Sequence, residues 1–207
     1  MIVNLLAISV IVLVIWLFIG AKKIGHVSQG SKIGDRPNSA ILLIDLQTIF
    51  WESGPYDEES KFKAQSAIEA EVLQAQDAGS PVIAIRQEWS ILSTKIIAKL
   101  LMKGQAIAGS KAIELAVPFA DMANHTLTKR VQDAFETGKL DVLLEQLDVG
   151  TLRILGLDGN YCVAKTAQGA RQRGFDVAIV TAGVLVGNPA KYKSVLNTLN
   201  AAGVLQV

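Results

Sequence analysis

The only cysteine of the chain, Cys162, lies in the stretch GLDGNYCVAKTAQGA, where an apolar run ends and a helical pattern begins. A thiolate is a strong nucleophile, but a free cysteine with a pKa of about 8.5 is mostly protonated at neutral pH. A helix N-terminus and a neighbouring lysine both favour the thiolate, and a carboxylate can accept the thiol proton. A single cysteine forms no internal disulfide, so two interpretations stay open: a small buried hydrophobic residue or a reactive thiol.

Two charged residues, Asp45 and Lys129, stand at the ends of other runs that have the pattern of strands. The carboxyl ends of parallel strands share one edge of a sheet, so Asp45, Lys129 and Cys162 could meet there. The trio suits attack by sulfur, with the carboxylate as base, the ammonium beside the thiolate, and turn N–H groups facing an oxyanion. Taken singly, Asp45 could cap a backbone segment and Lys129 could lie on a solvated face. Only the combination favours catalysis.

The elements that must position these residues alternate along the chain from about residue 40. Short apolar runs predict strands at 40–45, 81–86, 124–129, 151–157, 176–181 and 203–207. Helical spacing between them predicts helices within 58–79, 138–150, 164–174 and 189–203. This order predicts an α/β fold with a parallel sheet covered on both faces. The region 90–118, mostly helical in pattern, either packs as structure or partly covers a pocket.

The first residues read MIVNLLAISVIVLVIWLFIG, in which Asn4 and Ser9 are the only polar side chains. At ~1.5 Å per residue this run reaches roughly 30 Å as a helix, which matches the ~30 Å hydrocarbon core of a bilayer. A cleaved signal peptide is disfavoured because the basic residues follow the run instead of preceding it. The sequence therefore predicts a transmembrane anchor at 1–20 that contacts the lipid bilayer.

The stretch after the apolar run, AKKIGHVSQGSKIGDRPNS, is polar, contains glycine and has no periodicity. It predicts a linker at 21–39, followed by a domain at 40–207. Its basic residues predict, by the positive-inside rule, a single-pass protein whose domain lies in the cytoplasm. These residues are Lys22, Lys23, Lys32 and Arg36.

Composition limits the other classes. The 207 residues, of which 50% are hydrophobic, suffice for one well-packed domain. Lys and Arg number 20 against 19 for Asp and Glu, and a net charge of +1 offers no strong field for a polyanion. Nucleic acid is therefore not an expected partner.

Three stretches carry a resemblance to a known family: AILLIDLQTIF, KRVQDAF with the downstream TGKLDVLLEQL, and LRILGLDGNYCVAKTAQGARQRGFDVAIVTAG. From about residue 40 to 207 the chain resembles the isochorismatase-like cysteine hydrolases, which include nicotinamidases, N-carbamoylsarcosine amidohydrolase and isochorismatase. The resemblance implies a three-layer αβα sandwich with a mostly parallel six-stranded sheet. It also implies a homo-oligomer of unspecified size.

Matched residue by residue, the resemblance implies that Asp45, Lys129 and Cys162 form the catalytic triad. It further implies a cis peptide bond after Gly156, at Leu157–Asp158, in a turn that presents backbone N–H groups to the oxyanion. The oxyanion turn is thus expected to comprise Leu157, Asp158 and Cys162.

The chain departs from the metal-dependent nicotinamidases, whose Asp-x-His element and further histidine it lacks. Its only histidines are His26 and His125, and Glu88 in QEWSILS has no neighbouring imidazole. The sequence therefore predicts no catalytic metal and no cofactor. Nicotinamide is accordingly not an expected substrate.

Aromatic residues near the expected strand ends indicate a pocket for a small planar or amide-bearing molecule, although ordinary packing explains them equally well. Arg86, also at a strand end, could bind a carboxylate or pair with Glu88 or Asp45. The other candidate pocket residues are Phe50, Trp51, Trp89 and Tyr161.

The leading interpretation is a membrane-tethered, metal-independent cysteine hydrolase that cleaves a C–N bond of a small amide or ureido substrate through a thioester. One alternative is an isochorismatase-type vinyl-ether hydrolase in which Asp45 is the acid and Cys162 is incidental. Another is a catalytically silent member that binds a metabolite or a partner.

Overall fold

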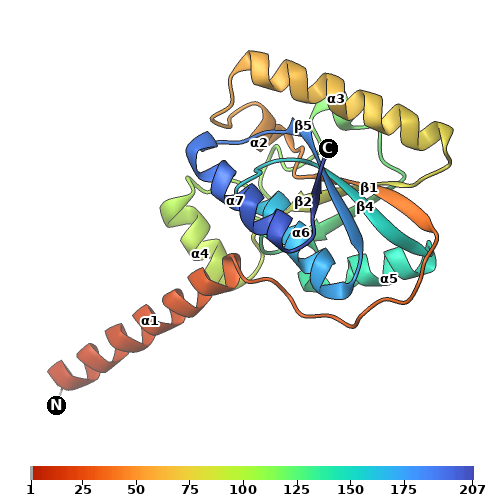
Figure 1. Cartoon of the computed structure of the whole chain (residues 1–207). Helices are drawn as coiled ribbons and strands as arrows, with labels where there is room; N and C mark the ends of the chain where they lie inside the picture. The colour runs from red at the N-terminus through yellow and green to blue at the C-terminus, as the bar shows by residue number, and fades with distance from the viewer. Residues whose placement is uncertain (1) are drawn as a thin grey trace.

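The computed structural model describes the backbone of residues 2–207 and the side chains of residues 8–207, and within this part the strands form one six-stranded sheet (Figure 1). All neighbouring strands pair in parallel, in the order β3-β2-β1-β4-β5-β6. The strands are β1 (Asn38–Ile44), β2 (Val82–Gln87), β3 (His125–Lys129), β4 (Val149–Gly156), β5 (Asp176–Val184) and β6 (Leu205–Gln206). The parallel six-stranded sheet is confirmed. Its strand order reverses between β1 and β4, the place where open α/β sheets bind ligands.

Alternation along the central strand β1 separates two cores. Leu42 and Ile44 belong to one buried cluster, and Ile41 and Leu43 belong to the other. Helix α3 (Glu58–Asp77) covers the second cluster, whereas α5 (Lys139–Gln146), α6 (Cys162–Arg173) and α7 (Pro189–Ala201) cover the first (Figure 1). The result is an αβα sandwich, in which the apolar strands are buried on both faces as the sequence pattern requires.

The turn between β4 and α6 depends on Gly156. Its φ is 113°, and a Cβ there would lie 2.1 Å from the carbonyl oxygen of Ile44 on the neighbouring strand. Only glycine has both the conformation and the space for this close approach. The next peptide bond, Leu157–Asp158, is cis, at the position that the resemblance implies. Helix α6 then begins at Cys162.

Helix α1 (Ile2–Ile24) packs against the domain only through its C-terminal part, beside α4 (Leu92–Leu101) (Figure 1). Ile24 is buried in a cluster with Ile97. Gly20 approaches α4 so closely that a Cβ would lie 2.6 Å from Cβ of Ser93. Most of the preceding apolar side chains of α1, from residue 8 onward, are exposed.

The predictions of a transmembrane anchor at 1–20 and of a single-pass protein with a cytoplasmic domain are wrong, and the predicted contact with the lipid bilayer, which depends on this anchor, is not shown. Among the described residues, no helix has the length and apolar character needed to cross a membrane. Helix α1 continues through Lys22 and Lys23 to Ile24, which packs on the domain. The side chains of residues 1–7 lie outside the described part.

Candidate active site

The carboxyl edge of the sheet brings the three expected catalytic residues into contact. Asp45 follows β1, Lys129 is the last residue of β3, and Cys162 is the first residue of α6. Lys129 Nζ lies 2.9 Å from Asp45 Oδ2 and 3.2 Å from Cys162 Sγ. The Asp45 carboxylate also interacts with the Cys162 thiol. Three residues far apart in the chain thus surround one point beside the strand-order reversal.

The backbone at Asp45 leaves the strand conformation at once. Its φ is 54°, in the left-handed region that aspartate tolerates better than most residues. Its N–H still donates to the carbonyl oxygen of Ile85 on β2, at 2.8 Å. This bond fixes the residue against the sheet while the chain turns toward α2 (Thr48–Trp51).

Burial makes the three groups one electrostatic unit. Lys129 is completely buried. Burial lowers its pKa, but Asp45 and Cys162 together have the larger effect and raise the pKa above its usual value, so the ammonium stays charged. Burial raises the pKa of Asp45 above its usual range, against the attraction of Lys129. A carboxylate with a raised pKa is a stronger base than an exposed one.

Burial also raises the pKa of the Cys162 thiol, and the Asp45 carboxylate adds to this effect, while Lys129 opposes it. The thiol is therefore protonated at neutral pH. The sequence favoured a thiolate because of the helix N-terminus and the lysine, but removal from water outweighs both. The neighbouring Asp45 carboxylate is placed to accept this proton.

Gln87, which the sequence analysis missed, joins this unit from the end of β2. Its Oε1 accepts a hydrogen bond from Lys129 Nζ. The buried side chain of Gln47 holds the Gln87 backbone by accepting from its N–H at 2.6 Å and donating to its carbonyl at 3.2 Å. Among the described residues, Asp45 Oδ1 and Gln87 Nε2 are buried without a hydrogen-bond partner. One acceptor and one donor thus remain beside the thiol, and both residues line the same pocket.

The turn before α6 supplies candidate oxyanion donors. The N–H of Leu157 is not available, because it donates to the carbonyl of Ile44 at 2.9 Å. Within residues 2–207 the N–H groups of Asp158 and Cys162 have no acceptor. The Asp158 carboxylate fixes the turn by accepting from the N–H groups of Asn160 (2.7 Å) and Gly187 (2.6 Å). The candidate oxyanion donors are therefore reduced to the N–H groups of Asp158 and Cys162.

A cavity of about 720 Å³ opens over this unit, lined by Asp45, Gln87 and Cys162 among others. Of the expected pocket residues, Phe50, Trp89 and Tyr161 line it. The segment after α4 forms part of the wall, so region 90–118 does border a pocket. Other lining residues, which sequence reasoning missed, are Tyr56, Met102, Lys103, Gln105 and Gln132.

Trp51 and Arg86 do not line this cavity. Trp51 is 8% exposed and packs edge-on against Phe119, with ring centroids 4.7 Å apart. Arg86 forms ion pairs with Glu88 and Glu114, one of the possibilities left open by the sequence. Arg86 precedes Gln87 on β2, so strand alternation directs its side chain to the opposite face of the sheet, whereas Trp51 ends α2 and packs in the buried cluster of Phe119.

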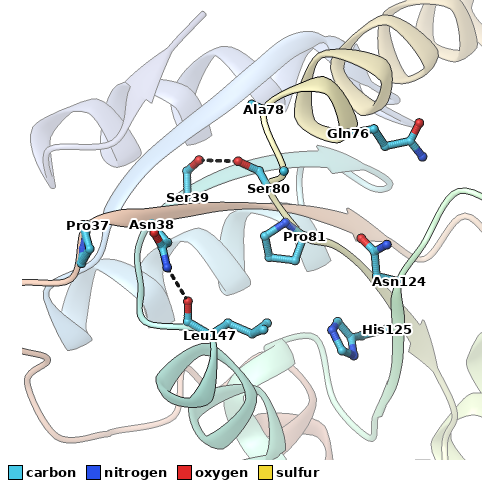
Figure 2. Close-up of a pocket in the computed structure, with 11 residues that line it drawn as sticks. Pro37, Asn38, Ser39, Gln76, Ala78, Ser80, Pro81, Asn124, His125 and Leu147 are labelled. Atoms are coloured by element: carbon cyan, nitrogen blue, oxygen red, sulfur yellow. Dashed lines mark hydrogen bonds between the residues drawn. The ribbon is translucent and has the colours of Figure 1, made fainter.

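A second cavity of about 720 Å³ lies at the opposite edge, where β1, β2 and β3 begin (Figure 2). His125 lines it, but its other polar side chains bond locally: Asn38 Nδ2 donates to the carbonyl of Leu147 at 2.9 Å, and the hydroxyls of Ser39 and Ser80 are 3.0 Å apart. The lining contains no cysteine and no Asp, Glu, Lys or Arg side chain. The carboxyl edge is therefore the better candidate for catalysis.

The donor set around the thiol does not fit a transition metal. Across the part of the chain that the structure describes, no three His, Cys, Asp or Glu side chains are grouped to hold an ion. The wall beyond β2 presents the amide of Gln87 and the indole of Trp89, while Glu88 pairs with Arg86. An amide and an indole are poor ligands compared with imidazole and thiolate.

Solved structures share this fold. An isochorismatase family protein from Desulfovibrio vulgaris is 24% identical with a TM-score of 0.72, and the match covers 83% of this chain and 94% of that one. A pyrazinamidase/nicotinamidase from Streptococcus mutans is 21% identical with a TM-score of 0.71, covering 82% and 100%. An N-carbamoylsarcosine amidase from Thermoplasma acidophilum is 18% identical with a TM-score of 0.68, covering 82% and 95%.

No curated protein shows a significant sequence match to this chain. The sequence model of the isochorismatase domain, however, matches residues 39–207, which include the whole sheet from Ser39 onward and all three members of the buried unit. The chain belongs to the isochorismatase-like hydrolase family.

Proposed function

We propose that this protein is a metal-independent cysteine hydrolase that cleaves a C–N bond of a small amide or ureido substrate through a thioester. The observation that carries the proposal is the position of Lys129 Nζ, 2.9 Å from Asp45 Oδ2 and 3.2 Å from Cys162 Sγ. A buried thiol between an ammonium and a carboxylate with a raised pKa has both a base and a counter-ion for its activation. The amide-hydrolase relatives named above support this reaction class.

In the first half-reaction, the Cys162 proton moves to Asp45 as sulfur attacks the carbonyl carbon. The carbonyl electrons shift to oxygen, which accepts hydrogen bonds from the N–H groups of Asp158 and Cys162. When this intermediate collapses, the C–N bond breaks and the leaving nitrogen takes the proton from Asp45. A thioester on Cys162 remains.

In the second half-reaction, water gives a proton to Asp45 while its oxygen attacks the thioester carbon. The C–S bond breaks, and the departing sulfur recovers the proton from Asp45. One water is consumed, and a carboxylic or carbamic acid leaves. Lys129 stays charged throughout and stabilises whichever of sulfur and carboxylate is negative.

The two buried polar atoms without partners, Asp45 Oδ1 and Gln87 Nε2, support a binding site for an amide. Gln87 Nε2 is a buried donor without a partner, and leaving it unpaired is costly unless a ligand accepts from it. Phe50, Trp89 and Tyr161 add flat apolar surface above it. A small planar amide or ureido compound fits both features.

A vinyl-ether hydrolase is the second candidate, favoured by the raised pKa of Asp45 and its unpartnered Oδ1. A protonated Asp45 could donate to a substrate carbon while Cys162 takes no part. Homo-oligomerisation, implied by the resemblance, stays a prediction that light scattering can measure.

The test is a screen of small primary amides and ureido compounds for ammonia release by the full chain and by Cys162→Ala, Cys162→Ser and Asp45→Asn. We expect each variant to lose at least ~10³-fold in kcat, because each lacks a group that forms or breaks a bond. Ammonia release by Cys162→Ala at the parent rate would contradict the thioester, and hydrolysis of a vinyl ether by Cys162→Ala but not by Asp45→Asn would favour the vinyl-ether reaction. Absence of any turnover in the parent would favour a binding member.

A further inference from the structure

The segment that follows α1 is bound to the domain through buried polar contacts. We name residues 25–33 the strap. Ser28 donates from both its N–H (2.7 Å) and its hydroxyl (2.6 Å) to Asp133 Oδ2. Just before the strap, the carbonyl oxygen of Ile24 accepts from the N–H of Gln132 at 3.0 Å. The strap therefore fixes the loop 130–133, which leaves the end of β3.

The other side of the strap is fixed to α6. Arg173, the last residue of α6, is 2% exposed and donates to the carbonyl oxygens of Ser28 (3.0 Å) and Gln29 (3.1 Å). Its own carbonyl accepts from the N–H of Ile33 at 2.7 Å. Asp141 pairs with the same guanidinium at 2.6 Å. The strap thus joins the loop 130–133 to the helix that carries the candidate nucleophile.

The loop 130–133 in turn reaches the active site. The carbonyl oxygen of Val131 accepts from Lys129 Nζ at 3.3 Å, and Gln132 lines the pocket. Asp133 is also the N-cap of the short helix η2 (Ala134–Thr137), where its side chain accepts from the N–H of Phe135 at 3.0 Å. Ser28 therefore bonds one end of the segment 131–133, at Asp133, and the Lys129 ammonium bonds the other end, at Val131.

This set lies partly outside the family domain, whose sequence model begins at residue 39. We propose that Ser28 is a positioning residue: through Asp133 the strap holds the loop 130–133 in the conformation that keeps Lys129 beside Cys162. This inference rests on the proposed function, because it assigns the strap to the same triad. The N-terminal segment is then a working part of the active site and not a passive extension.

The test measures the pH dependence of iodoacetamide alkylation of Cys162 in the full chain. The titratable groups facing the thiol are Asp45 from the end of β1, Lys129 from β3 and Tyr56 from the loop before α3. Ser28→Ala removes the hydroxyl that bonds Asp133, so Lys129 is held less firmly and stabilises the thiolate less. We expect alkylation at pH 9 to slow by about threefold, in the same direction as in Lys129→Ala.

Two further variants separate positioning from general stability. Ser28→Thr keeps the hydroxyl and should restore the parent rate. Ser31→Ala changes an exposed serine of the same strap and should leave the rate unchanged. Thermal denaturation of each variant shows whether the fold is intact.

The outcomes distinguish this inference from the proposed function. If Lys129→Ala slows alkylation and Ser28→Ala does not, the strap has no positioning role and the inference is overturned. If Lys129→Ala also leaves alkylation unchanged, the proposed function fails and the strap inference fails with it. Slowing in Ser28→Ala that Ser28→Thr does not reverse would likewise contradict a role for the hydroxyl.

Discussion

At the scale of single residues, the site depends on the coupling of three buried groups. Cys162 keeps its proton because burial and Asp45 both disfavour the thiolate, while Lys129 limits that effect. Replacing Asp45 should therefore lower the pKa of the thiol, and replacing Lys129 should raise it. Opposite shifts in the two variants would distinguish a thiol coupled to both neighbours from a thiol whose pKa is raised by burial alone.

We predict that the alkylation midpoint of Cys162 in the parent lies above the ordinary pKa of about 8.5. Asp45→Asn removes the carboxylate that opposes the thiolate, so the midpoint should fall and alkylation at pH 8 should quicken. Lys129→Ala should raise the midpoint and slow alkylation. Rates of iodoacetamide labelling from about pH 6 to about pH 10 test the direction of the midpoint shift in both variants. Equal shifts in the two variants would contradict the coupling.

A second residue prediction concerns Gln87. Gln87→Glu keeps an acceptor for Lys129 but replaces the unpartnered donor, so binding of a second acceptor atom of the substrate should weaken. With an amide identified by the screen, we expect KM to rise about tenfold. Steady-state kinetics measure it, with Gln105→Glu, at the more open wall of the pocket, as the matched control. An unchanged KM would mean that Gln87 Nε2 does not contact substrate.

At the scale of elements, the β4–α6 turn positions Cys162 and the oxyanion donors together. The close packing of Gly156 against the backbone of Ile44 lets β1 and β4 run side by side to the point where both functional residues follow them. The turn is then held by the Asp158 carboxylate. Tyr56 adds a hydroxyl that donates to Asp158 Oδ2 at 3.2 Å.

We predict that Gly156→Ala destabilises the fold by about 3 kcal/mol, because the new Cβ would meet backbone that has no room to move. In a domain of this size the melting temperature should fall by roughly 10 °C. Gly34→Ala is the control, since its Cβ would meet nothing within 4 Å. Thermal unfolding followed by circular dichroism measures both, and similar melting temperatures would contradict the account of the turn.

At the scale of the whole molecule, the N-terminal segment has two unequal parts. The part of α1 with described side chains up to residue 15 is exposed, whereas Ile24 and the strap contact α4, α6 and the loop 130–133. The second part buries apolar surface and satisfies buried polar groups. Arg173 in particular would lose three of its acceptors without it.

We accordingly predict that deleting residues 1–15 leaves the melting temperature within about 2 °C of the parent, whereas deleting residues 1–30 lowers it by roughly 8 °C. Differential scanning calorimetry of the two truncated chains measures this. Equal melting temperatures would mean that the strap contributes nothing to the domain.

Much of this architecture is predictable from the sequence, because buried parallel strands are continuous apolar runs and three separate motifs mark the residues that meet at the carboxyl edge. The pocket is less predictable. Proximity to strand ends suggests Trp51 and Arg86, but Arg86 points to the other face of β2 and Trp51, at the end of α2, packs against Phe119. Gln87 was missed because its role comes from burial beside Lys129, which no local pattern reveals.

The N-terminal helix shows a different limit. Apolar composition in MIVNLLAISVIVLVIWLFIG suggests a bilayer span, but composition does not reveal that the helix continues to Ile24 and packs there on α4. The direction in which the pKa of Cys162 shifts is likewise not predictable from the sequence. Local neighbours favour the thiolate, and only the folded structure shows how completely water is removed from the site.

The most direct test of the central claim is mass spectrometry of the protein quenched in acid during turnover of an amide found in the screen. The account predicts an adduct with the mass of the substrate's acyl or carbamoyl group on the peptide that contains Cys162, present in the parent and absent from Cys162→Ala, which should release no product. Product release by Cys162→Ala at the parent rate, with no adduct in the parent, would contradict it.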